Sequence, residues 1–174
     1  MKNIAVIYKS KYGSTEEYAR WIAEELGADA LEVSAVKPEQ LTGYDLVIYG
    51  GGLYAGGIDG ARLVAKNPCK SLVVFTVGLA DPNETDYANI LAKNFSKELL
   101  QTVKIFHLRG AIDYEKLSFA HKGMMAVLKS ALSKKDESQL SSEDKAILST
   151  YGGNVNFVDR DAIAPIINYV KGIL

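Results

Sequence analysis

The stretch Asn3-Ile4-Ala5-Val6-Ile7-Tyr8, followed at once by Ser10-Lys11-Tyr12-Gly13-Ser14-Thr15, decides the fold of this chain. The apolar first segment predicts a buried β-strand. The second segment, rich in hydroxyl groups and containing a glycine, predicts a turn. Apolar residues then recur at spacings of three and four through residues 18–26, which predicts a helix with one core-facing side. The order strand, turn and helix is the starting unit of an α/β fold.

The turn between this strand and helix predicts a site for one phosphate. Backbone N–H groups are unpaired at a helix N-terminus, and together with the positive end of the helix dipole they favour an anion. Gly13 lets the backbone approach such a ligand closely. Four side-chain hydroxyls add possible donors: Ser10, Tyr12, Ser14 and Thr15.

Two nucleotide-binding templates do not fit this turn. A Walker A loop needs a lysine just after its last glycine, whereas Lys11 precedes Gly13. The dinucleotide fingerprint G-x-G-x-x-G is also absent from the turn. A structural alternative remains open, in which Ser14 is an N-cap and Glu17, three residues later, completes a capping box.

Composition narrows the class of protein. The 174 residues suffice for a single domain over 1–174, and the net charge of −1 offers no basic stripe for nucleic acid. We find no run of apolar residues long enough to span a membrane and no signal peptide, so a cytoplasmic protein is expected. The lone Cys69 cannot form an internal disulfide, and the distant His107 and His121 predict no metal site.

The alternation of strand and helix patterns predicts an α/β fold with a doubly wound, five-stranded parallel sheet. Near-uniform apolar strands agree with a sheet that helices cover on both faces. The predicted strands are residues 3–8, 29–33, 45–49 running into 50–52, 71–77 and 103–108. The predicted helices are residues 14–26, 59–66, 86–100 and 160–174.

Residues 110–159 exceed an ordinary connection and predict an inserted helical segment after the fifth strand. Its apolar spacing indicates a helix over residues 114–134, followed by a surface loop and a turn of helix. Met124 and Met125 on this helix have two interpretations, which are core packing or a hydrophobic groove for a substrate or partner.

Three loops should gather at the carboxyl ends of the strands, where parallel sheets bind ligands. The first is the phosphate loop. The second follows the third strand and places one aromatic ring, Tyr54, among small residues: Gly51, Gly52, Leu53, Ala55 and Gly56. The third follows the fourth strand: Thr76, Val77, Gly78 and Leu79. Tyr54 could lie against the face of a flat ligand, although each glycine-rich loop could also be merely flexible.

The phosphate loop resembles the [ST]-x-T-G-x-T motif of the flavodoxin superfamily, with Tyr12 in place of the usual threonine. Residues 110–119, the Met124-Met125 helix and the segment 151–159 are similar to a narrower branch, that of menaquinone-dependent protoporphyrinogen oxidase. The likeness covers essentially the whole chain. It implies the flavodoxin-like strand order 2-1-3-4-5, for which flavodoxin with FMN is itself the known example.

The resemblance implies one non-covalent FMN in a flavoprotein of electron transport. Residues 10–15 would surround the phosphate, and residues 51–56 and 76–79 the isoalloxazine. The partner would be a redox protein or a small electron acceptor such as a quinone, so the protein is either an electron carrier or an FMN-dependent oxidoreductase. One alternative is a quinone-dependent protoporphyrinogen oxidase of heme biosynthesis, peripheral at the membrane. Another is a binding module that kept the fold and lost the flavin.

Overall fold

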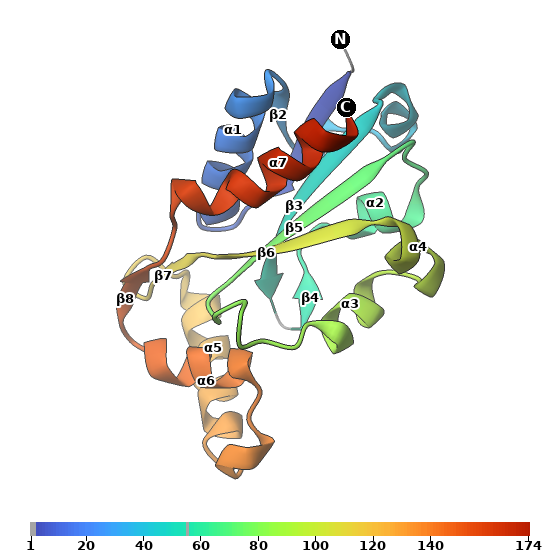
Figure 1. The fold of residues 1–174 in the computed structure, drawn as a ribbon. Helices are drawn as coiled ribbons and strands as arrows, with labels where there is room; N and C mark the ends of the chain where they lie inside the picture. Colours follow the sequence, from blue (N-terminus) through green and yellow to red (C-terminus); the bar gives the residue numbers. More distant parts are fainter. Residues whose placement is uncertain (1–2, 55) are drawn as a thin grey trace.

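The computed structural model describes residues 3–54 and 56–174, and its centre is a parallel sheet in the order β2-β1-β3-β5-β6 (Figure 1). These strands are β1 (Ile4–Lys9), β2 (Asp29–Glu32), β3 (Leu46–Tyr54), β5 (Leu72–Gly78) and β6 (Lys104–Arg109). The predicted doubly wound order is confirmed, because β5 and β6 are the fourth and fifth parallel strands. A short strand that the sequence pattern did not predict, β4 (Gly57–Ile58), pairs antiparallel with β3.

The order in which strands are added changes side at β1. Ile7 of β1 pairs with Leu31 of β2 on one side and with Tyr49 of β3 on the other. The chain therefore adds its second strand to one edge of β1 and all later parallel strands to the opposite edge. The loops that follow β1 and β3 diverge at this point and leave a crevice between them.

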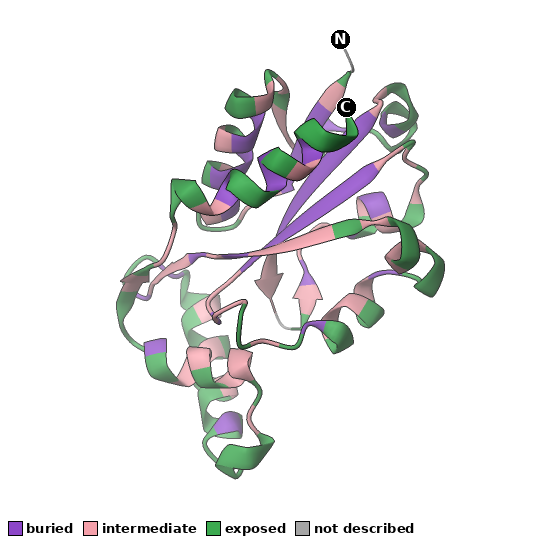
Figure 2. Ribbon diagram, in the orientation of Figure 1, coloured by how far each residue is buried: buried purple, intermediate pink, exposed green. Residues whose placement is uncertain are grey.

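Successive residues of each strand enter opposite halves of the core, as the period of two requires. Val6, Ile48 and Phe75 pack on one face of the sheet with α1 (Ser14–Leu26) and α7 (Ala164–Ile173). The neighbouring Ile7 and Val47 belong to the other face. That face is covered by three short helices: α2 (Arg62–Lys66), α3 (Ala88–Asn94) and α4 (Lys97–Thr102). Figure 2 shows the central strands buried along most of their length. Each fully buried Val or Ile contributes about 1.5–3 kcal/mol.

The capping-box alternative for the first helix is wrong. The N-cap of α1 is Gly13, in the left-handed region at φ 103°, and no side chain caps this end. Ser14 is the first helical residue, so its hydroxyl points to other partners. At the far end, Gly27 at φ 61° closes the helix, as glycine does at many helix C-termini.

Three predicted helices have different bounds in the structure. The helix expected over residues 86–100 is two helices, because Phe95 is extended and Ser96 starts α4 by accepting a 3.2 Å hydrogen bond from the Leu99 amide. The helix expected over 59–66 begins only at Arg62. The last predicted helix opens as a 3-10 turn, η4 (Arg160–Ile163), before α7. Two further 3-10 segments, η1 (Val33–Ala35) and η2 (Pro38–Gly43), join β2 to β3.

The inserted segment is a small substructure of its own. Strands β7 (Ala111–Asp113) and β8 (Asn154–Asn156) pair antiparallel at its base, and between them lie α5 (Phe119–Leu132), η3 (Glu137–Gln139) and α6 (Ser142–Thr150). The predicted 114–134 helix is therefore shorter, and the predicted turn of helix after it is a full helix. Figure 1 shows α5 and α6 beyond the carboxyl ends of the central strands. Within the described residues, no helix has the length and apolar content needed to cross a bilayer.

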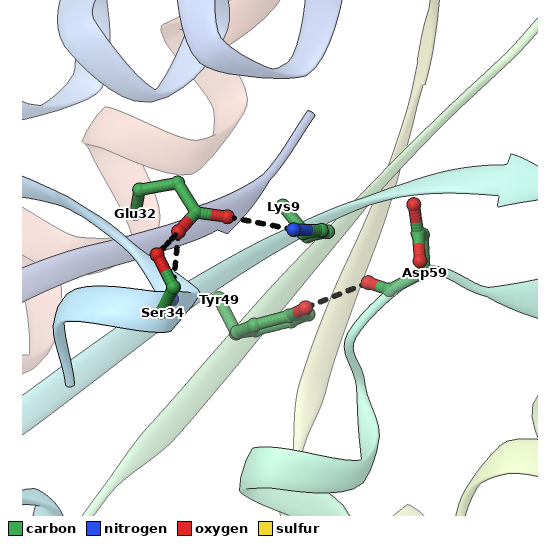
Figure 3. A network of polar contacts seen from close by, with 5 residues as sticks. All are labelled: Lys9, Glu32, Ser34, Tyr49 and Asp59. Carbon is green, nitrogen blue, oxygen red and sulfur yellow. Dashed lines mark hydrogen bonds and ion pairs between the residues drawn. The ribbon is translucent and has the colours of Figure 1, made fainter. Parts of the chain in front are cut away.

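Polar contacts join the end of β1 to the end of β2, and a separate hydrogen bond joins β3 to the segment after β4 (Figure 3). The Lys9 ammonium lies 3.0 Å from a Glu32 carboxylate oxygen, and Glu32 also accepts hydrogen bonds from the Ser34 hydroxyl and amide. Tyr49 donates a 2.6 Å hydrogen bond to the Asp59 carbonyl. The Ser34 hydroxyl first, and Lys9 next, lower the pKa of Glu32 to about 2.

This network predicts a pH-dependent stability term. The pKa of Glu32 is lower in the folded state than its usual 4.5, so its contribution is complete above that value and is lost as pH falls toward 2. Glu32→Gln should lower the free energy of unfolding by about 1 kcal/mol at neutral pH, a modest value because the side chain is 32% exposed. Urea unfolding from neutral to acid pH should show this difference shrinking. A difference independent of pH, or an equal effect of Glu39→Gln at an exposed glutamate, would contradict the assignment.

The pairing of β3 with β5 places Gly50 beside Phe75 and predicts that Gly50 does not tolerate a side chain. A Cβ at Gly50 would lie 2.6 and 2.7 Å from two ring carbons of the fully buried Phe75. Gly50→Ala should therefore destabilise the protein by about 1–3 kcal/mol through overpacking. The matched control is Gly43→Ala, since a Cβ there meets nothing within 4 Å. Denaturant unfolding of both variants measures the effect, and equal stabilities would refute it.

Candidate functional site

A cavity of about 450 Å³ opens at the carboxyl ends of the central strands. It brings together all three loops that the sequence singled out, and α5 and α6 form its far wall. The predicted site residues that line it are Ser10, Lys11, Tyr12, Ser14, Thr15, Gly52, Leu53, Tyr54, Val77, Gly78 and Leu79. The cavity therefore lies at the crevice where the strand order reverses.

Four other predicted site residues do not line this cavity. Gly13 and Gly56 form turns at φ 103° and 76°. Gly51 is a packing position, because a Cβ there would lie 2.7 Å from the Asp59 carbonyl oxygen. The Thr76 side chain is buried and hydrogen-bonds the His107 ring at 2.6 Å. The remaining predicted residue, Ala55, lies outside the described residues.

The phosphate loop is folded by its own polar groups. The Gly13 amide donates a 3.1 Å hydrogen bond to the Ser10 hydroxyl oxygen, which tightens the turn before α1. The Ser14 hydroxyl oxygen accepts a 3.1 Å hydrogen bond from the Ala111 amide of β7. Both hydroxyl groups still have a proton to donate. Thr15 is buried beneath the loop and faces Gly52. This donor set and the open N-terminus of α1 fit a phosphate group.

The Tyr12 phenol, which replaces a threonine of the family motif, reaches out of the loop to α5. Its hydroxyl hydrogen-bonds Nδ1 of His121, and the His121 ring also packs edge-on against Tyr54, with centroids 5.5 Å apart. Lys11 covers one face of the Tyr54 ring at 3.8 Å, and the Tyr54 hydroxyl donates to Met124 Sδ at 3.3 Å. Lys11 therefore occupies part of the Tyr54 ring surface that we expected to contact a flat ligand.

The inserted segment supplies an apolar wall that sequence reasoning placed only in part. The additional apolar lining residues are Ile112, Leu117, Met124, Met125, Val127, Leu128, Ala131 and Ile147; Gly110, Ala111, Asp59, His121 and Glu143 complete the lining. The groove interpretation of Met124 and Met125 is thus supported. Its signal was the amphipathic pattern of residues 117–132, which equally fits core packing because periodicity does not say what covers a helix face.

Behind the loop after β5, a histidine is held as a neutral structural group. The His107 ring stacks on Tyr87 with centroids 3.5 Å apart and planes 6° from parallel. Burial lowers the pKa of His107 to about 4, so it is uncharged near neutral pH. Across the described residues, histidine, cysteine and acidic side chains form no cluster of three that could hold a metal ion.

One acidic side chain enters the cavity without a partner. Glu143 of α6 lines the wall, and its Oε1 is buried and makes no hydrogen bond to any described residue. Burial raises the pKa of this carboxyl, and the neighbouring charge of Asp144 adds to the effect. The cavity therefore has the Lys11 ammonium near its phosphate loop and a carboxyl with a weakened tendency to ionise on its α6 wall.

A second cavity, of about 530 Å³, lies at the opposite end of the sheet. It is lined by residues just before and at the start of β5 and just before β6, including Cys69, Leu72 and Val103. Burial raises the pKa of the Cys69 thiol, which makes it less reactive. Because ligands of parallel sheets bind at the carboxyl ends of the strands, we assign the functional site to the first cavity.

Comparison with known proteins agrees with this architecture. Residues 5–139 match the family described as Flavodoxin domain. A curated relative, an uncharacterized protein of Methanocaldococcus jannaschii, is 40% identical over 52 residues, which is 29% of this chain and 35% of that protein. The match thus spans about a third of the relative's length.

Solved structures to which this chain is similar include flavodoxins and other flavoproteins. A flavodoxin from the domain Archaea has a TM-score of 0.46 at 17% identity, covering 62% of this chain and 82% of that chain. A WrbA-like flavodoxin from Agrobacterium tumefaciens has a TM-score of 0.44 at 17% identity, covering 99% of both chains. A flavoprotein in complex with FMN from Lactobacillus acidophilus has a TM-score of 0.41 at 14% identity, covering 63% and 93%. On its family match over residues 5–139, this chain belongs to the flavodoxin domain family.

Proposed function

We propose that this protein binds one FMN non-covalently and serves in redox chemistry, as an electron carrier or as an FMN-dependent oxidoreductase. The observation that carries the proposal is a hydroxyl-bearing loop at the N-terminus of α1, opening into a cavity at the β1/β3 switch point. When bound, FMN supplies one- and two-electron transfer, and the protein supplies orientation and control of access.

The two ends of the cavity suit the two ends of this cofactor. At the phosphate end, the first-turn amides of α1 and the hydroxyls of Ser14 and Thr15 are the donors, and Lys11 brings a positive charge. At the other end, Gly52 admits a flat ring close to the backbone, and residues 77–79 cover it. Lys11 covers part of the Tyr54 side chain, so Tyr54 contacts the flavin ring only with the part that Lys11 leaves free.

The inserted helices favour a small or hydrophobic electron acceptor as a second possibility. Phe119 and Val127 of α5 are 95% and 71% exposed, and Val127 also lines the cavity. Such exposed apolar residues beside a binding site are typical of a surface that meets a hydrophobic partner. A quinone, and with it the protoporphyrinogen oxidase reaction implied by the insertion, is one candidate of this kind.

Replacement of Gly13 tests the phosphate loop. Gly13→Asp should weaken FMN binding at least about tenfold, because it adds a negative charge to the loop that would hold the phosphate dianion. Gly13→Asn is the matched control, since it has the same size and the same strain at φ 103° without the charge. The visible absorption spectrum after incubation with FMN and desalting measures retention.

The outcome separates a redox protein from a binding module. Retention by the parent and the Asn variant, with loss in the Asp variant, supports the cofactor assignment. A parent that stays colourless after incubation with FMN would overturn it and leave a flavin-free module on a flavodoxin fold. Equal losses in both variants would show that strain, and not phosphate repulsion, governs the loop.

The exposed apolar residues of α5 are tested by vesicle binding. The double variant Phe119→Ser, Val127→Ser should bind neutral phosphatidylcholine vesicles containing menaquinone at least about tenfold more weakly, because each lost side chain removes about 1.5–3 kcal/mol of buried apolar contact. Phe119→Leu, Val127→Ile keeps the apolar character and is the control. Co-sedimentation measures binding, and a parent that stays in the supernatant at low salt would argue against a membrane-borne acceptor.

A further inference from the structure

Glu143 lies in the cavity against the glycine that ends β5. It lies in the first turn of α6, and its Oε1 sits over Gly78, the last residue of β5. A Cβ at position 78 would lie 2.8 Å from that oxygen. Gly78 begins the loop that we assign to the ring of the cofactor. The carboxyl group therefore stands over the β5 end of the loop that we assign to the ring of the cofactor.

Other residues hold α6 in this position, so Glu143 is not needed for the helix itself. The capping box of α6 is formed by Ser141 and Asp144. The Asp144 amide donates a 3.1 Å hydrogen bond to the Ser141 hydroxyl oxygen. The Ser142 hydroxyl donates a 2.7 Å hydrogen bond to the Glu84 carbonyl, which fastens α6 to the loop after β5. The Asp144 carboxylate lies 3.7 Å from Lys135. Of Ser141, Glu143 and Asp144, only Glu143 lines the cavity.

A buried carboxylate without a hydrogen bond is costly, and the neutral acid is favoured in its place. Burial of Glu143 is the main cause and Asp144 a second. The titratable and charged groups around the cavity are Lys11 and Tyr12 of the phosphate loop, Tyr54 and Asp59 near β3 and β4, Tyr87 and Arg109 beside the loop after β5, and His121 of α5. None of these makes a hydrogen bond to Glu143 Oε1 in the described residues.

We propose that Glu143, given the FMN site proposed above, is a positioning residue that presents a neutral carboxyl group to the polar edge of the bound ring and makes the affinity for reduced FMN depend on pH. A neutral carboxyl both donates and accepts a hydrogen bond, which matches a ring edge bearing nitrogen and oxygen atoms. When the carboxyl loses its proton, the resulting anion opposes the negative charge that the ring gains on reduction. Reduced FMN then binds less tightly than oxidised FMN as pH rises.

The first measurement needs no cofactor. Carbon-13 NMR of labelled glutamate side chains in the flavin-free protein follows the Glu143 carboxyl, which is assigned by its absence in Glu143→Gln. It should titrate clearly above the ordinary glutamate value of about 4.3. Titration at the ordinary value would overturn the proposal, whether or not FMN binds.

The second measurement uses the FMN-loaded protein. The dissociation constants of oxidised and dithionite-reduced FMN are compared between about pH 5 and about pH 9, in the parent, in Glu143→Gln and in Glu143→Leu. The reduced-to-oxidised ratio in the parent, divided by that in Glu143→Gln, should rise roughly tenfold over this range, the size of a one-unit change in proton affinity. Glu143→Leu, which lacks a donor, should bind the ring more weakly than Glu143→Gln at every pH.

The possible failures are distinct. A parent that retains no FMN refutes the proposed function and this inference with it. A parent that retains FMN, but whose ratio follows that of Glu143→Gln at every pH, refutes only the inference. Dividing by the Gln variant removes the proton equilibria that the two proteins have in common.

Discussion

The pairing of β1 with β2 on one side and β3 on the other is the constraint on which the rest of the structure depends. Because strands are added to opposite edges of β1, the loops that leave β1 and β3 separate and do not close over one another. The N-terminus of α1 then faces an open crevice with its amides unpaired. Buried residues such as Ile7 and Ile48 hold this register by packing on opposite faces, since a slip of one residue would turn each to the wrong face.

The inserted segment converts that crevice into a walled cavity. Its attachments to the loops that line the site include three hydrogen bonds, of the Ala111 amide to the Ser14 hydroxyl oxygen, of Tyr12 to His121 and of Tyr54 to Met124. In addition, α6 is fastened to the loop after β5. The same helix α5 leaves Phe119 exposed, an apolar residue that the sheet does not need.

Charge is distributed unevenly along the cavity. Lys11 and the positive end of α1 face the cavity from the phosphate loop, much of the remaining wall is apolar, and Glu143 enters from α6. In such surroundings an electrostatic interaction is stronger than in water, because little solvent screens it. A single carboxyl inside the cavity therefore has a stronger electrostatic effect on a bound group than a surface ion pair, such as that of Arg20 with Glu16, has on stability.

Local pattern was enough for the sheet, because the alternation of apolar strands and amphipathic helices needs no knowledge of distant residues. It also placed the three loops at one edge, since parallel strands end together. It failed where a side chain acts against the period, as Ser96 does in starting a new helix. The sequence by itself determined the alternation of strands and helices and the place of the hydroxyl-bearing loop, and its resemblance to the flavodoxin superfamily implied the strand order. Only the tertiary structure decided that Thr76 turns away to His107 and that Glu143 turns in, because the direction of a side chain depends on which distant segment packs against it.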